Sequence, residues 1–343
     1  MRCTLSLVSV LSLASLASAQ VVASDAFSYT GALTANGWVA HSGAGNKQIM
    51  SNGSYATLDQ SAGSGEDVNK SFAPFAATDT IYASFRFRVP SGNPVNPDND
   101  GLYFAHFKDS GTLFRARTGL MSPAAAGDFG LAINADNGSL GAGAVWPGDL
   151  AFDTWYAVVI SWDASTGRSE LWLDPTCGSA PSINHTGTFM GDAMEGFAFR
   201  QSNDYTGFID VDDVVVGRSF ADVLPGTGTF SVTCSGCAGL AQTASGSPNI
   251  GGNVYFSVPN ATAMFIGLSN TCLPLCPAGC NLGTDVTVLI FGSQIGLRIP
   301  CNSSLVGGNV YSQGIEAGNG GCAASVFGVA IATSDTIRTT IGS

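Results

Sequence analysis

The sequence predicts an all-β protein in which a large jelly-roll-like sandwich precedes a smaller β-sandwich-like unit. Three observations support this fold class. Charged residues make up only 11% of the 343 residues, 44 glycines punctuate the chain, and Val, Thr, Phe and Ser gather in short stretches between turn signals. Long stretches with a helical period of 3.6 residues do not compete with this pattern. The length suits about two domains, each large enough to bury a core.

The first residues are typical of a secretory signal. Arg2 gives a positive start, residues 5–16 form an apolar stretch, and Ala17-Ser18-Ala19 supplies small residues for cleavage, so a signal peptide is expected at 1–19. Later apolar runs fall well short of the roughly 20 residues that a membrane-spanning helix needs. We therefore expect a secreted, extracellular or cell-surface protein.

The first domain is expected at residues 23–223. The strand at 81–89 places its odd-numbered apolar residues on one face and directs Arg86 and Arg88 to the other. The further strands expected in this domain are 102–108, 112–118, 155–163, 169–174, 196–201 and 207–217.

The strands 102–108 and 112–118 are close enough in sequence to form a short hairpin. With a two-residue turn at 110–111, Phe107 would pair with Phe114, and His106 would pair with Arg115. The two rings would then share one face and the two cations the other.

A linker is expected at residues 224–229, because Pro225-Gly-Thr-Gly-Thr229 has the composition of a loop. A second, cysteine-containing β domain follows at 230–343. Its expected strands are 250–258, 261–268, 285–291, 305–311, 324–332 and 336–341.

Several segments of the first domain carry a family resemblance. They are Asp25-x-Phe27-Ser28-Tyr29, Tyr103-Phe-Ala-His-Phe-Lys-Asp109, Phe114-Arg-Ala-Arg117, Trp155-Tyr-x-Val-Val159, Leu171-Trp-Leu-Asp-Pro175, Phe199-Arg-Gln-Ser202 and Val211-Asp-Asp-Val-x-Val-Gly217. Together they resemble bacterial members of the concanavalin A-like lectin/glucanase superfamily, which are laminin-G-like jelly rolls. The resemblance covers roughly residues 25–223 and implies a fold, not a ligand, since the superfamily holds lectins, hydrolases and structural modules.

The end of the chain carries a second resemblance. Met264-Phe-Ile-Gly-Leu-Ser269 and the last ten residues, 334–343, look like a C-terminal β module of large exported bacterial proteins. This resemblance implies no activity.

Eight cysteines follow the signal segment, and in an exported protein they favour disulfides. They are Cys177, Cys234, Cys237, Cys272, Cys276, Cys280, Cys301 and Cys322. Zinc is the alternative, because some spacings resemble those of metal ligands, but no histidine lies beyond His185. Seven of the eight lie after residue 230, so either Cys177 pairs across to the second domain or some thiols stay free.

The net charge of −12 argues against a nucleic-acid partner, which would require clustered cations. The few cations are nevertheless informative, because most of those in the first domain occupy outward positions of strands and could line one sheet face. The candidate ligand-binding residues are Arg86, Arg88, His106, Lys108, Arg115, Arg117 and Arg200, with Trp146 as an exposed stacking platform. Arginine suits carboxylate or sulfate groups. The alternative is a solvated face whose cations pair with the protein's own acids.

Two acidic patterns in the first domain could carry chemistry. A retaining glycosidase needs two carboxylates about 5–5.5 Å apart, but in the segment 210–215 a valine, Val215, stands where the second glutamate would be required. Calcium is the other option, with Asp25 meeting Asp212 or Asp213. Alternatively, Asp25 caps a turn and the pair of aspartates lies on a solvated strand edge.

These observations favour a non-enzymatic carbohydrate-binding, lectin-like protein whose partner is a polysaccharide or a cell-surface glycan. The arginines favour an acidic polysaccharide. A structural or adhesive protein with extracellular protein partners is the first alternative, and a glycoside hydrolase is the second. No cofactor is required by this prediction, although calcium stays an option. Neither a nucleic-acid partner nor an integral membrane segment is expected.

Overall fold

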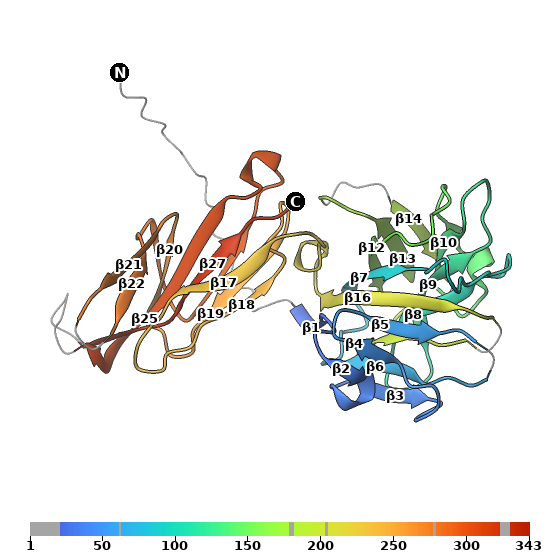
Figure 1. Cartoon of the computed structure of the whole chain (residues 1–343), viewed down its shortest axis with the longest axis horizontal. Helices are drawn as coiled ribbons and strands as arrows, with labels where there is room; N and C mark the ends of the chain where they lie inside the picture. The colour runs from blue at the N-terminus through green and yellow to red at the C-terminus, as the bar shows by residue number, and fades with distance from the viewer. Residues whose placement is uncertain (1–20, 62, 178–181, 203–204, 277–278, 323–329) are drawn as a thin grey trace, which may run out of the picture.

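The computed structural model describes residues 21–343 except 62, 178–181, 203–204, 277–278 and 323–329. The signal segment predicted at 1–19 lies outside the described residues. Two β lobes lie side by side, with the early strands in one and the late strands in the other (Figure 1). The predicted all-β fold class is confirmed, and every pairing between named strands is antiparallel. Within the described residues, no helix is long and apolar enough to cross a membrane.

The N-terminal sandwich consists of two sheets. The nine-stranded sheet runs in the order β14 (Ser182–Thr186), β13 (Arg168–Leu173), β12 (Tyr156–Asp163), β7 (Thr80–Arg88), β16 (Phe208–Gly217), β5 (Ala56–Asp59), β4 (Met50–Asn52) and β2 (Thr30–Ala32), and β1 (Val21–Asp25) also pairs with β16. The seven-stranded sheet runs in the order β11 (Ala144–Val145), β10 (Gly130–Asn134), β9 (Phe114–Met121), β8 (Leu102–Lys108), β15 (Gly196–Phe199), β6 (Asp67–Ser71) and β3 (Val39–Ser42).

The C-terminal lobe contains three smaller sheets. The six-stranded sheet comprises β17 (Thr229–Cys234), β27 (Thr336–Thr340), β25 (Asn309–Cys322), β20 (Ala263–Gly267), β23 (Val288–Phe291) and β26 (Ile331–Thr333). The others are β18 (Thr243–Gly246), β19 (Asn253–Ser257) and β24 (Gln294–Arg298), and the hairpin of β21 (Asn270–Pro274) and β22 (Asn281–Thr284). Short 3-10 helices lie at η1 (Leu33–Ala35), η2 (Leu140–Ala142), η3 (Phe220–Asp222) and η4 (Ser303–Leu305).

The sheets therefore divide between β16 and β17, whereas the domain boundaries given above stay a prediction. Of the strands expected in the C-terminal half, the one at 305–311 differs most from the observed structure. Residues up to Leu305 form η4, and β25 begins only at Asn309. Most of the strand expected at 324–332 lies outside the described residues.

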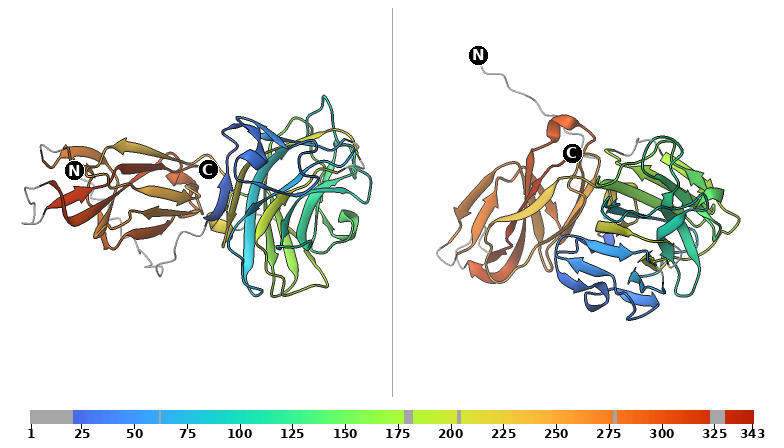
Figure 2. Two further views of the ribbon diagram at one scale, coloured as in Figure 1. Left: turned by 90° about the horizontal axis from the view of Figure 1, so that it is seen from below. Right: turned by 45° about the vertical axis from the view of Figure 1, so that its right-hand side comes forward.

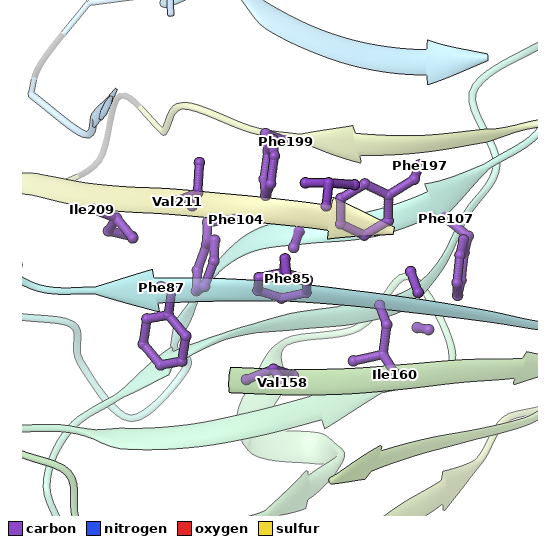
Figure 3. Close-up of a cluster of buried hydrophobic side chains, with 14 of the residues drawn as sticks. Phe85, Phe87, Phe104, Phe107, Val158, Ile160, Phe197, Phe199, Ile209 and Val211 are labelled. Atoms are coloured by element: carbon purple, nitrogen blue, oxygen red, sulfur yellow. The ribbon is translucent and has the colours of Figure 1, made fainter. Parts of the chain in front are cut away.

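The core of the N-terminal sandwich is built from the inward-facing residues of both sheets (Figure 3). On β7, the predicted alternation is confirmed, because Ile81, Ala83, Phe85 and Phe87 are fully or almost fully buried. The facing rings are Phe104, Phe107, Phe197 and Phe199, all fully buried. Full burial of one such side chain contributes about 1.5–3 kcal/mol, so this aromatic cluster holds the two sheets together.

The hairpin of β8 and β9 has a different register from the one predicted. Phe107 pairs with Arg115 and Lys108 with Phe114, with irregularities after Tyr103 and Ala105. The reason is a longer loop, in which the Asp109 carboxylate accepts hydrogen bonds from the backbone N–H groups of residues 111 and 113. A single shift of register reverses the face of each side chain, which changes the predicted site.

Three disulfides are described: Cys177–Cys301, Cys234–Cys272 and Cys237–Cys280. Cys276 is also disulfide-bonded, and the side chain of Cys322 lies outside the described residues. The cysteines whose spacing resembled that of zinc ligands are therefore oxidised. Cys177 does reach across to the C-terminal lobe, as one of the two predicted arrangements required.

Candidate functional site

The outer face of the seven-stranded sheet gathers cations and aromatic rings. His106 and Lys108 lie on β8, Arg117 on β9, His41 on β3, and Arg200 directly after β15. The rings of Tyr103 and Phe114 lie among them. These seven residues are called the cationic face below.

Direct contacts hold the cationic face together. The guanidinium carbons of Arg117 and Arg200 lie 4.4 Å and 4.5 Å from the ring centre of Tyr103. The ring of His106 lies 4.4 Å from that of Phe114 and 6.0 Å from that of His41. Each cation–π contact favours one arginine conformation, so these two guanidinium groups are held in place before any ligand arrives.

Direct ion pairs with carboxylates do not hold these cations, although the charge of Arg200 acts on the Asp67 carboxyl on β6 and lowers its pKa against the effect of burial. In the described part of the chain, Lys108, Arg117 and Arg200 have no carboxylate within ion-pair distance. Lys108 donates to the carbonyl of Asp109 and Arg117 to that of Asn137. Such neutral partners satisfy donors but leave the positive charge in place.

Several buried nitrogen atoms of the face have no hydrogen-bond partner among the described residues. They are Nδ1 of His41, both ring nitrogens of His106 and Nε of Arg117. Leaving a buried donor or acceptor unsatisfied costs about 1–3 kcal/mol. These four atoms lie together on the cationic face, where burial keeps them from solvent.

Burial and mutual repulsion shift the pKa values of this face. The pKa of His41 is lowered to about 4, mainly by burial and also by the charge of Lys108. Burial also takes the pKa of His106 well below its ordinary value, with the neighbouring cations adding to the effect. Both histidines are therefore neutral at pH 7, and the lysine and the two arginines carry the charge.

The prediction that all seven cations share one face is wrong. Arg86 and Arg88 lie on β7 of the other sheet. Arg86 contacts Asp213 at 3.3 Å and Asp212 at 3.8 Å. Arg88 contacts Asp210 at 2.6 Å. β7 belongs to the nine-stranded sheet, so the alternation that turns both arginines away from the core also turns them away from the seven-stranded sheet.

Arg115 was also misplaced by the sequence prediction. Its side chain is 1% exposed, and it forms an ion pair with Asp192 at 2.6 Å. It also lies over the rings of Trp162 and Phe189. The backbone of Ala116 has a φ of 52°, a left-handed conformation that interrupts the alternation and separates Arg115 from Arg117. His106 does lie on the cationic face, but it is fully buried instead of outward and exposed.

Trp146 is not the exposed platform that was predicted, because it is half-buried and packs against the sandwich core. Conversely, the sequence prediction missed His41, Tyr103 and Phe114 as site residues. Tyr103 and His106 are three positions apart, so strict alternation places them on opposite faces. The irregularity between Tyr103 and Ala105 brings Tyr103 and His106 to the same face. No residue pattern in the sequence predicts this irregularity.

The predicted carboxylates do not form a donor set that fits calcium. β1 does pair with β16, so Asp25 lies near the strand that carries Asp212 and Asp213. However, the Asp25 carboxylate accepts hydrogen bonds from Phe27, Tyr29 and Trp38 and pairs with Lys70 at 3.2 Å. The other two aspartates pair with Arg86. Over the described ranges, no group of three or more His, Cys, Asp and Glu residues is arranged to hold a metal ion.

Neither a family model nor a curated protein matches this sequence. Among solved structures, alginate lyase Aly36B is 13% identical and has a TM-score of 0.39, with 60% of this chain and 98% of that chain covered. The CBM2 module of the evolved Dit of Lactobacillus casei BL23 phage J-1 is 16% identical, with a TM-score of 0.38 and coverage of 58% and 95%.

The seed lectin of Lotus tetragonolobus is also similar, with 12% identity, a TM-score of 0.34 and coverage of 52% and 92%. At this level of likeness, no ligand and no site residue are carried over to the present chain.

Proposed function

We propose that this protein is an extracellular, non-enzymatic binder of acidic polysaccharide and that the cationic face is its binding site. One observation carries the proposal: among the described residues, Lys108, Arg117 and Arg200 share a sheet face without a direct ion pair to a carboxylate, in a chain whose net charge is −12. Neighbouring cations without ion-pair partners repel one another, and an anionic ligand would offset this repulsion.

The geometry suits anionic groups that an arginine can bind in a bidentate manner, and the net charge of −12 argues against nucleic acid. Two arginines flank the ring of Tyr103, so planar forks that suit carboxylate or sulfate lie beside a flat apolar surface. A sugar acid offers both an anionic group and an apolar ring face. Disulfides support the extracellular part of the proposal, because they persist in oxidising compartments. Membership of the concanavalin A-like superfamily stays part of the proposal.

Binding of polygalacturonate, alginate and a sulfated glycan should be measured by calorimetry, with neutral dextran as the control. Wild-type protein should bind at least one acidic polymer, and affinity should fall as salt rises, because exposed charges are screened over about 8 Å at physiological ionic strength. Arg117→Ala and Arg200→Ala should each weaken binding about tenfold or more, since a charge-assisted contact contributes about 1.5–3 kcal/mol.

Arg168→Ala is the matched control, because Arg168 is exposed and pairs with Glu170 on another sheet. Equal affinities of the Arg117, Arg200 and Arg168 variants would contradict the proposed site. Release of cleaved sugar from any of these polymers would contradict the non-enzymatic part. Failure to bind any acidic glycan would favour the alternative of a structural or adhesive protein.

A further inference from the structure

A cleft of about 590 Å³ lies where the N-terminal sandwich meets the C-terminal lobe. On the sandwich side it is lined by Arg86, Trp155, Asp174 and Asp213, and on the other side by residues 222–228 and 246–249. We call it the junction cleft. Figure 2 shows the two lobes side by side, meeting over a narrow region. Its volume is within the range of small-molecule sites, about 300–1,000 Å³.

Two connections hold the walls of the junction cleft in place. The disulfide Cys177–Cys301 joins the sandwich to the C-terminal lobe. The fully buried Asp222 carboxylate accepts hydrogen bonds from the hydroxyl of Tyr255 at 2.6 Å and the amide of Asn253 at 3.0 Å. Because both connections are internal to the junction, the opening has a defined shape before a ligand enters.

The indole of Trp155 is one of the apolar surfaces that line the cleft. The guanidinium carbons of Arg86 and Arg88 each lie 5.0 Å from its ring centre, and the ring of Tyr55 lies 5.8 Å away. These contacts fix the indole, yet Trp155 remains half-buried and so still presents surface to the cleft. A fixed aromatic ring with a polar N–H at its edge is suited to a ligand that is apolar on one side and polar at its edge.

The charge of the cleft differs from that of the cationic face. Asp174 is exposed, and one of its carboxylate oxygens accepts from the backbone N–H of Ala157 at 2.7 Å. The side chain of Asp213 is 49% exposed. Arg86, the cation of the cleft lining, is already paired with Asp213. The Asp174 carboxylate has no cation paired with it in the described residues and would repel an anionic polymer, and both Asp174 and Asp213 can accept hydrogen bonds from hydroxyl groups.

We propose that the junction cleft binds a neutral saccharide, with one sugar ring against Trp155 and its hydroxyl groups donating to Asp174 and Asp213. The protein would then have two sugar sites of opposite preference, one on each sheet of the sandwich. This second site does not depend on the first, because the two share no residue.

Neutral tetrasaccharides of β-1,4-glucan, β-1,3-glucan, xylan, mannan and chitin should be titrated by calorimetry and tryptophan fluorescence, beside polygalacturonate. At least one neutral tetrasaccharide should bind, and Trp155→Ala should weaken it tenfold or more while polygalacturonate binding is unchanged. Arg117→Ala should do the reverse. This reciprocal pattern separates failure of the cleft from failure of the cationic face.

Asp174→Asn is the second variant, in case Trp155→Ala does not fold. Asp174 has a φ of 45°, a conformation that asparagine tolerates, so the fold should survive while the acceptor strength falls. We expect a several-fold loss of neutral-sugar affinity. The proposal is overturned if no neutral tetrasaccharide binds at millimolar concentration, or if a folded Trp155→Ala or Asp174→Asn variant binds as tightly as wild type.

Discussion

The outward-facing cations of the two sandwich sheets differ in their cross-strand partners. On the nine-stranded sheet, β7 lies beside β16, and the register places Arg86 opposite Asp212 and Arg88 opposite Asp210. On the seven-stranded sheet, Arg117 lies opposite Asn134. Cross-strand neighbours are the partners that a strand residue meets first. The neighbouring strand therefore decides whether a cation is paired within the protein or left for a ligand.

Figure 1 makes the difference easy to follow, because β16 crosses the middle of one sheet beside β7, whereas β8 and β9 belong to the other. His106 lies opposite Ala198 on β15, so no acid meets it across the strands either. An arginine is thus a poor indicator of a binding site by itself. Its cross-strand partner is the more informative residue.

The largest effect that tests this comparison is expected for Arg115→Ala. Arg115 is buried with its ion pair to Asp192, so its removal leaves an uncompensated carboxylate and a cavity beside Trp162. Breaking a buried pair in this way costs about 3–5 kcal/mol. Denaturant-induced unfolding should report this loss, and acidic-polysaccharide binding per folded molecule should be unaffected.

Arg168→Ala serves as the exposed control for Arg115→Ala, because that side chain is 44% exposed and surface pairs contribute about 0–1 kcal/mol. If the two variants lose equal stability, Arg115 is not the buried structural cation described here. If Arg115→Ala weakens glycan binding without loss of stability, Arg115 contacts the ligand and does not serve mainly to stabilise the fold.

A smaller effect is expected for Arg88→Ala on the nine-stranded sheet. Arg88 donates twice to Asp210, at 3.2 Å and 2.6 Å, and Asp210 is itself almost fully buried. Hydrogen bonds to charged groups contribute about 1.5–3 kcal/mol, so the variant should lose a similar free energy of unfolding. Arg200→Ala, which breaks no ion pair, should stay within about 0.5 kcal/mol of wild type. Equal losses in the two variants would remove the distinction between the sheets.

Part of this arrangement is visible in the sequence. The alternation of apolar and polar residues in β7 predicted correctly that Arg86 and Arg88 point away from the core. The odd number of cysteines after residue 230 indicated that either Cys177 pairs across the chain or some thiols stay free, and the first arrangement is confirmed by the Cys177–Cys301 disulfide. These features depend on local periodicity and on simple counting, which a single sequence records.

The rest depends on features that have no residue signature. The irregularities of β8 and the left-handed Ala116 each shift the alternation by one residue, and they decide that Tyr103 joins His106 while Arg115 leaves Arg117. Trp155 lies over Arg86 and Arg88 of β7, and the cleft beside it forms only where the two lobes pack together, which no local residue pattern records.

The smallest expected effect is on how the free energy of unfolding depends on pH. The pKa of Asp212 is raised to about 6, chiefly by burial and then by the neighbouring charge of Asp213. Between pH 4 and pH 6 the folded state therefore holds a proton that the unfolded state has released, so this group makes the protein less stable as pH rises through that window. Asp212→Asn should remove the effect and gain about 1 kcal/mol relative to wild type between pH 4 and pH 7.

The histidines of the other sheet should give the opposite slope. Because the pKa of His41 is lowered to about 4, the unfolded state binds the extra proton between about pH 6.5 and pH 4, and stability falls as pH is lowered through that range. His41→Gln should therefore flatten the loss of stability toward low pH, whereas Asp212→Asn should steepen it. Urea unfolding at pH 4, 5, 6 and 7 measures both slopes. Changes of the same sign in the two variants would contradict the separate charge environments of the two sheets.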